Sequence, residues 1–213
     1  SKVEKMYCAP GNAGIAELAE CVPIGAMEFD KLVTFAKEKE IDFTAEKFRD
    51  KHLNSIYIGG GTPTTLSPEQ LDRLLTEIKR HFDLSKVQEF TVEAGRPDSI
   101  TREKLEVLRR HPVTRISINP QTMNQKTLDL IGRRHTVENV KEKFHIAREL
   151  GFDNINMDLI MGLPGEDLDD VKHTLEEIEA LKPDSLTVHS LAIKRAARLN
   201  MFKEEYADLK INN

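Results

Sequence analysis

The sequence predicts an α/β fold of about six parallel β/α units, arranged as a partial β/α barrel or as an open Rossmann-like sheet. Short runs rich in β-branched residues alternate with longer stretches in which apolar residues recur at helical spacing. One strand with its helix takes about 30 residues, the length of a βαβ unit. Such regular alternation favours parallel strands joined by right-handed crossovers, and both architectures satisfy that rule.

Strands are expected at residues 3–9, 55–60, 89–94, 114–120, 154–162 and 185–191. Helices are expected at residues 27–40, 44–52, 67–82, 101–111, 124–132, 137–151, 167–182 and 193–210. Thr44 is taken as the start of a second helix, although Lys47 stands where a capping box has Glu or Gln. We expect residues 1–213 to form a single α/β domain.

Several helix ends carry their own signals. Ser67 is a candidate N-cap, Pro68 suits the first helical position, and Gln70 completes a capping box. Thr101 is a second candidate N-cap. Gly151 stands where a helix commonly ends in a left-handed residue.

The composition excludes several classes of function. Hydrophobic residues make up 39% and charged residues 31% of the 213, which is typical of a globular protein. The net charge of −5 and the pI of about 5.9 argue against nucleic acid as a partner. No apolar run is long enough for a membrane span or resembles a signal peptide, so we expect a cytoplasmic protein with no membrane partner.

The second expected strand ends in the sequence GGGTPTTL at residues 59–66. Glycine lets the backbone approach a ligand closely because no Cβ intervenes. Free backbone groups at such a turn can bind an amine or a carboxylate. A tight structural turn is the other interpretation.

Polar residues end the next two expected strands. Glu93 can bind an ammonium group or a ribose hydroxyl, or it can form a local ion pair with Arg96. Ser117, Asn119 and Gln121 alternate along the following strand and should share one face. Three uncharged hydrogen-bonding residues on one face are typical of a polar barrel lining rather than of a core.

Charged residues follow in the second half of the chain. Arg133 lies in the cationic turn GRRHT and offers a fork of donors that suits a carboxylate, although a solvated helix-end charge explains it equally well. Asp158 stands alone among apolar strand residues, where an unpaired carboxylate is costly to bury. His189 ends the sixth strand and is interpreted as a structural residue.

Residues 54–206 resemble the radical S-adenosylmethionine (SAM) enzymes of the oxygen-independent coproporphyrinogen III oxidase/dehydrogenase type. The segments IYIGGGTPTTL, FTVEAGRPDSIT, RISINPQTMNQKTLDLIGRRHT and ARELGFDNINMDLIMGLPGE carry the likeness. The resemblance implies that the methionine amino end of SAM meets Gly59, Gly60, Gly61, Thr62 and Pro63. It also implies that the amino acid, ribose or carboxylate of SAM contacts Glu93, Gln121, Arg133 and Asp158.

The cysteine count conflicts with that family's chemistry. The family holds a [4Fe–4S] cluster on the three thiolates of a CxxxCxxC-type loop, whereas this sequence contains only Cys8 and Cys21. From this count we expect no metal site, no catalytic residue and no required cofactor. A [4Fe–4S] cluster is not expected, and SAM should bind weakly at most.

Residues 2–42 resemble the N-terminal region of phosphoribosylamine–glycine ligase through the segment YCAPGNAGIA…AECVPI. The chain is therefore interpreted as a recombined or engineered hybrid, with a ligase-like βα segment at residues 1–44 and a radical-SAM-like partial barrel at residues 45–213. Such a hybrid would lack complete enzymatic activity and keep only a remnant SAM pocket. The alternatives are an active radical SAM oxidoreductase of porphyrin biosynthesis and a partial ligase module that binds a phosphorylated sugar at residues 10–14.

The expected partners are a small nucleoside ligand and a second copy of the chain. Six β/α units do not close a barrel, so apolar strand residues should remain uncovered. The residues in question are Ile56, Ile58, Ile116, Ile118, Ile155 and Leu159. On this argument a C2 homodimer would cover the open side of the sheet.

Overall fold

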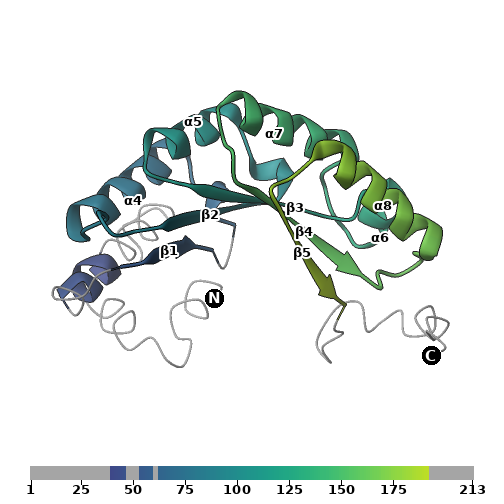
Figure 1. The fold of residues 1–213 in the computed structure, drawn as a ribbon, viewed down its shortest axis with the longest axis horizontal. Helices are drawn as coiled ribbons and strands as arrows, with labels where there is room; N and C mark the ends of the chain where they lie inside the picture. Colours follow the sequence, from purple (N-terminus) through teal and green to yellow (C-terminus); the bar gives the residue numbers. More distant parts are fainter. Residues whose placement is uncertain (1–38, 47–52, 60–61, 192–213) are drawn as a thin grey trace, which may run out of the picture. The chain divides into compact units, whose positions relative to one another are not determined.

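The computed structural model describes residues 39–46, 53–59 and 62–191 (Figure 1). They belong to two compact units, one within residues 1–54 and 68–88 and the other within residues 55–67 and 89–213. The strand expected at 3–9 and the helix expected at 193–210 lie outside the described residues, as do Gly60 and Gly61. The prediction of a single domain stays a prediction.

The first unit contains a helix at residues 39–46 and α4 (Pro68–His81). The helix at 39–46 runs straight through Thr44, so the break expected there is wrong. The segment contains no Gly or Pro, and the incomplete capping signal does not interrupt it. A contact of 3.0 Å joins His81 Nε2 to Asp42 Oδ1 and links the two helices. Helix α4 begins at Pro68, as expected for a proline in the first turn.

The second unit is built on a five-stranded parallel sheet. Its strands are β1 (Ser55–Ile58), β2 (Glu89–Gly95), β3 (Arg115–Gln121), β4 (Ile155–Met161) and β5 (Ser185–Ser190). The crossovers contain α5 (Arg102–Arg110), α6 (Gln125–Leu130), α7 (Val137–Glu149) and α8 (Leu168–Leu181). Two short 3₁₀ helices, η2 (Pro63–Thr65) and η3 (Pro97–Ser99), follow β1 and β2.

The strand order decides between the two predicted architectures. The strands are paired in the order β1-β2-β3-β4-β5, so each connection steps to the next strand in the same direction. Right-handed crossovers that always step one way place their helices on one face, and Figure 1 shows α5, α7 and α8 together on that face. A Rossmann-like sheet reverses direction and carries helices on both faces. The partial β/α barrel is therefore confirmed.

The two faces of the sheet differ sharply in polarity. The apolar strand residues point toward the helices, and Ile116, Ile118, Ile155 and Leu159 have no exposed surface. The alternate positions form the opposite face, called the inner face below, and are mostly polar: Glu93, Ser117, Asn119, Asn156 and Asp158 lie there among others. The premise of the homodimer argument was therefore wrong for these four residues, while Ile56 and Ile58, which it also named, are half-buried. The homodimer itself stays a prediction.

The ends of the helices follow the signals in the sequence. The Thr101 hydroxyl accepts a hydrogen bond from the Lys104 amide, as expected of an N-cap. At the end of α7, Gly151 has φ +85°, its amide bonds to the Arg148 carbonyl, and the Phe152 amide bonds to the Ala147 carbonyl. This pair of bonds is a Schellman motif, and the positive φ confirms the left-handed helix end predicted at Gly151.

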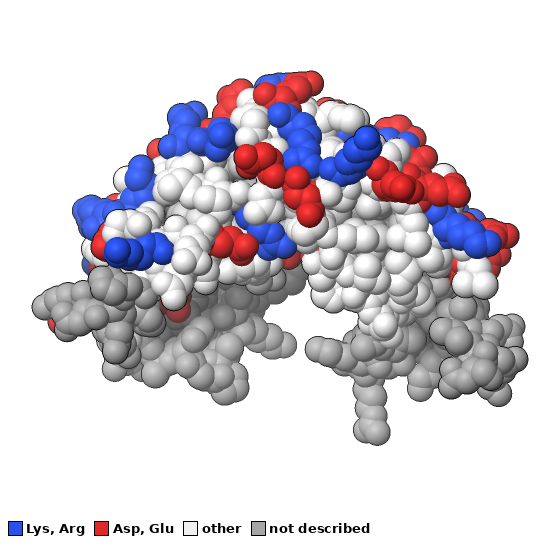
Figure 2. All heavy atoms as spheres, in the orientation of Figure 1, with Lys and Arg blue, Asp and Glu red and all other residues white. Residues whose placement is uncertain are grey.

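Two surface properties bear on partners. Among the helices that the structure describes, none is long and apolar enough to cross a membrane. On the face drawn in Figure 2, Lys and Arg lie intermixed with Asp and Glu rather than gathered in one basic field. The exclusion of nucleic acid stays a prediction.

The Gly151→Ala variant should lower the free energy of unfolding by about 1 kcal/mol, because a side chain in the left-handed region is strained. Urea unfolding followed by circular dichroism measures the loss. Glu142→Ala, at an exposed position of the same helix, serves as the control. Equal stability of Gly151→Ala and the parent chain would contradict the role given to Gly151.

Candidate functional site

The glycine turn begins directly after β1 and approaches the neighbouring strand closely. A Cβ placed on Gly59 would lie 2.7 Å from Glu93 Oε2 and 2.3 Å from Tyr57 Cε1. Both distances are shorter than real Cβ contacts, so any larger residue would displace a side chain of the inner face. The sequence predicted a close backbone approach here, and the structure brings Gly59 and Glu93 together. Thr62 and Pro63 lie at the start of η2.

A buried hydrogen-bond cluster fastens this loop to the next strand. The Thr64 hydroxyl donates to the Ala94 carbonyl and lies 2.6 Å from the Ser99 hydroxyl. Lys104 donates its ammonium to the carbonyls of Thr64 and Ser99. Burial lowers the pKa of Lys104 below its ordinary value. The loop that carries the predicted ligand residues is thus tied to the carboxyl end of β2, a contact that the sequence did not reveal.

Glu93 lies within a polar group on the inner face. Asn119 donates its amide to Glu93 Oε1 at 3.2 Å, and the Ser117 hydroxyl donates to Asn119 Oδ1 at 3.0 Å.

The pKa of the Tyr57 hydroxyl is raised above its ordinary value of 10.0, mainly by burial and then by the carboxylates of Glu93 and Asp158. The two predicted acids therefore lie close enough to Tyr57 to act on the same phenol. Tyr57 was not predicted, although its alternation with Ile56 and Ile58 places it on this face.

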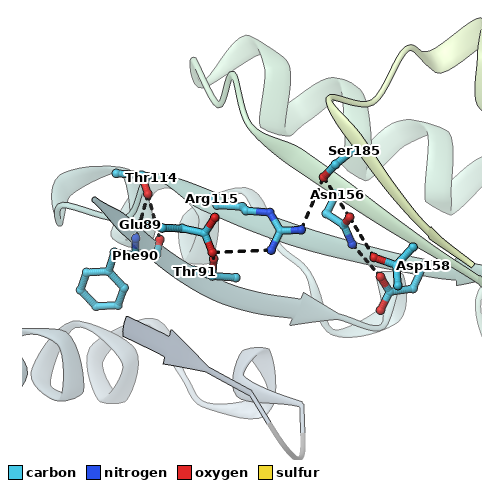
Figure 3. Close-up of polar contacts among 9 residues, drawn as sticks. Glu89, Phe90, Thr91, Thr114, Arg115, Asn156, Asp158 and Ser185 are labelled. Atoms are coloured by element: carbon cyan, nitrogen blue, oxygen red, sulfur yellow. Dashed lines mark hydrogen bonds and ion pairs between the residues drawn. The ribbon is translucent and has the colours of Figure 1, made fainter. Parts of the chain in front are cut away.

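Asp158 ends a row of polar contacts that crosses the inner face (Figure 3). Asn156 donates its amide to Asp158 Oδ1 at 2.6 Å and accepts hydroxyl hydrogens from Ser185 and Thr187. Ser185 in turn accepts from Arg115 at 3.4 Å. Asp158 is therefore partnered, which removes most of the cost of placing a carboxylate among apolar neighbours.

Gln121 departs from the regular strand geometry that the sequence suggested. It has φ +73°, and the pairing of β3 with β4 shifts register between Ile118 and Gln121. Alternation therefore does not place the Gln121 side chain, although Ser117 and Asn119 share a face as expected. Buried His135 contacts the Pro120 carbonyl through Nε2 at 3.3 Å and so supports the peptide that leads into Gln121.

Arg133 lines a cavity of about 270 Å³ at the carboxyl end of the sheet. Arg96, Gly132 and Leu191 contribute to the same cavity, together with Ile131, Ile160 and Leu163. Burial, then the nearby charge of Arg96, lowers the pKa of Arg133, while Asp98 opposes this effect. Sequence reasoning considered Arg96 only as an ion-pair partner of Glu93, whereas in the structure Arg96 pairs with Asp98 at 3.3 Å.

No group of three His, Cys, Asp or Glu side chains suited to a metal ion occurs in residues 39–46, 53–59 and 62–191. Both cysteines lie outside these ranges. The described site is therefore one of carboxylates, amides, arginines and glycine backbone. These groups can bind an uncharged hydroxyl, an ammonium group and a carboxylate in one ligand.

The comparisons identify the class of protein. The model of the Radical SAM superfamily matches residues 7–178, and the chain belongs to that superfamily. The match includes most of the segment interpreted as ligase-like, and no comparison supports a phosphoribosylamine–glycine ligase region or a hybrid.

Its similarities within the superfamily are specific. The chain is 52% identical over 161 residues to the oxygen-independent coproporphyrinogen-III oxidase-like protein HemZ of Bacillus subtilis, covering 75% of this chain and 32% of HemZ. It is 41% identical over 160 residues to the heme chaperone HemW of the same organism, covering 75% of this chain and 42% of HemW. The solved structure of Escherichia coli coproporphyrinogen III oxidase, a radical SAM enzyme, matches with TM-score 0.69 and 30% identity, covering 79% of this chain and 38% of that one.

Membership of this superfamily corrects the cofactor expectation. Its members bind a [4Fe–4S] cluster and SAM, and TsrM from Kitasatospora setae has been solved with a [4Fe–4S] cluster bound. The expectations that no cofactor is required and that a cluster is not expected were therefore wrong. They came from counting cysteines in 213 residues, whereas the chain spans about a third to two fifths of the relatives it matches.

The Glu93→Gln variant should lower the pKa of Tyr57 toward 10, because one of the two nearby carboxylates loses its charge. Ultraviolet titration of the phenols measures this, with Tyr57→Phe identifying the Tyr57 signal among the three tyrosines. Glu103→Gln, on the exposed side of α5, is the control. An unchanged Tyr57 titration in Glu93→Gln would mean that the carboxylate does not act on the phenol.

Stability should fall as the pH falls below the ordinary histidine pKa, partly because of His135. Burial lowers the pKa of His135 in the folded chain, so the unfolded chain takes up its proton first. The free energy of unfolding begins to fall near pH 6.5, the ordinary histidine pKa, and stops falling once the pH is below the pKa of His135 in the folded chain. His135→Gln keeps an amide donor for the Pro120 carbonyl but cannot titrate, and its urea midpoint should depend less on pH between 7.5 and 5. Parallel pH profiles for the two proteins would refute this account.

Proposed function

We propose that this chain is the SAM-binding portion of a radical SAM protein related to the coproporphyrinogen oxidase-like and heme chaperone proteins. The observation that carries the proposal is that Gly59 closely approaches Glu93 and that the carboxylates of Glu93 and Asp158, on β2 and β4, both act on Tyr57 from the inner face of the sheet. In parallel α/β folds ligands bind at the carboxyl ends of the strands.

The chemistry of the residues suits the two ends of SAM. The ribose presents two hydroxyl donors, which a carboxylate such as Glu93 or Asp158 can accept. The amino-acid end presents an ammonium group for backbone carbonyls of the glycine turn and a carboxylate for Arg133. The Gln121 side chain, which makes no hydrogen bond with other described residues, adds a donor and an acceptor.

The iron–sulfur part of the chemistry is expected outside the described residues. In this superfamily the cluster, when bound, supplies the electron that cleaves SAM. Cysteine thiolates hold such clusters, and the described residues contain none. The described part of the chain therefore serves to bind and orient SAM, and the redox or heme-handling activity of the relatives belongs to much longer proteins.

Glu93→Gln and Asp158→Asn should each weaken SAM binding by about tenfold to a hundredfold, the usual worth of a hydrogen bond to a charged group. Isothermal titration of the 213-residue chain with SAM measures the affinity, and thermal melts confirm that each variant is folded. Asp153→Asn, an exposed carboxylate just before β4, is the matched control. The proposal fails if the parent chain does not bind SAM, or if neither variant binds it more weakly.

A further inference from the structure

The cavity at the carboxyl end of the sheet has one charged wall and one apolar wall. Arg96 follows β2 directly, and Arg133 lies in the turn between α6 and α7. The apolar wall consists of Ile131, Ile160, Leu163 and Leu191. A volume of about 270 Å³ accommodates part of a small organic molecule rather than a single ion.

The two guanidinium groups in this cavity are not fully compensated. Arg133 makes no side-chain hydrogen bond or ion pair with the other residues that the structure describes. Arg96 pairs with Asp98 through one terminal nitrogen, while its Nε is buried with no partner among the described residues. A buried donor without an acceptor lowers the stability of the chain. Both arginines therefore have unused donors.

The charge balance of the cavity indicates a single negative charge on its ligand. Arg96 and Arg133 carry two positive charges, and their charges oppose each other. Asp98 offsets one of the two. A monoanion would neutralise the remainder, whereas a phosphate dianion would leave an excess negative charge against an apolar wall.

We propose that Arg96 and Arg133 together bind the carboxylate at the amino-acid end of SAM. This inference rests on the proposed function and adds Arg96 to it, since the family resemblance assigned only Arg133 to SAM. Guanidinium groups bind carboxylates through paired N–H donors, and Arg96 has donors besides the terminal nitrogen that pairs with Asp98. The apolar wall then lies beside the aliphatic part of the same amino acid.

The test compares SAM with 5′-methylthioadenosine, a neutral thioether that lacks the aminobutyrate of SAM and with it the carboxylate, the ammonium group and the sulfonium charge. SAM has the carboxylate, whereas 5′-methylthioadenosine keeps the adenosine and the sulfur and lacks it. Arg96→Gln should weaken SAM binding by tenfold or more and leave 5′-methylthioadenosine binding unchanged. Arg134→Gln removes an exposed arginine one position after Arg133 and should change neither affinity.

A second measurement follows the proposed contact directly. In the parent chain the Nε–H resonance of Arg96 should move on addition of SAM but not on addition of 5′-methylthioadenosine, because only SAM brings a carboxylate. Binding of 5′-methylthioadenosine to Arg96→Gln serves as the folding control. A variant that keeps its fold still binds this analogue, whereas an unfolded variant binds neither ligand.

Three results would overturn the role of Arg96. Unchanged SAM affinity in Arg96→Gln would show that Arg96 does not bind the ligand, even though the proposed function stands. An equal loss for SAM and 5′-methylthioadenosine would show that Arg96 supports the site without contacting the carboxylate. Failure of the parent chain to bind either ligand would overturn both this inference and the proposed function.

Discussion

The constraint on which the second unit depends is that every crossover steps in the same direction along the sheet. Because the crossovers are right-handed, their helices fall on one face, and most apolar strand residues point that way. The inner face is then free to carry polar residues without harming the core. A doubly wound sheet would bury both faces and exclude the row from Glu89 to Asp158 that Figure 3 shows.

Buried polar residues on a sheet face destabilise the fold unless they form hydrogen bonds with one another. The polar residues of the inner face form two hydrogen-bonded groups. One runs from Ser117 through Asn119 to Glu93, and the other runs from Arg115 to Asp158. In each group a side-chain amide donates to the carboxylate, Asn119 to Glu93 and Asn156 to Asp158. Such networks hold side chains in fixed positions, which is what a ligand site requires.

The sequence revealed much of this arrangement because the signals were local. Strand and helix positions followed from periodicity, and the caps at Thr101 and Gly151 followed from residue type. Alternation along one strand correctly separated Ser117 and Asn119 from Ile116 and Ile118. Local sequence patterns could not decide between a barrel and a Rossmann-like sheet, because both folds have the same alternation of strands and helices and differ only in which strands pair.

The parts of the site that were missed depend on contacts between distant segments. Lys104 and Thr64 meet across 40 positions, and the left-handed backbone of Gln121 has no sequence signal, since such a conformation is unusual for a residue other than Gly. The cysteine argument failed for a different reason. It inferred a missing cofactor from a cysteine count, whereas the sequence segments that resemble the radical SAM family indicated the family correctly.

The turn between α6 and α7 connects the two halves of the proposed SAM site. Arg133 faces the cavity, and two positions later His135 is buried against the carbonyl of Pro120, immediately before Gln121. A single short segment thus positions both the Arg133 guanidinium in the cavity and the His135 side chain against the end of β3. Gly132, with φ +72° and open space where a Cβ would stand, lets the chain turn sharply enough for both residues to reach their places. The sequence GRRHT, interpreted at first as a cationic turn, is better understood as the element that aligns the strand end with the arginine cavity.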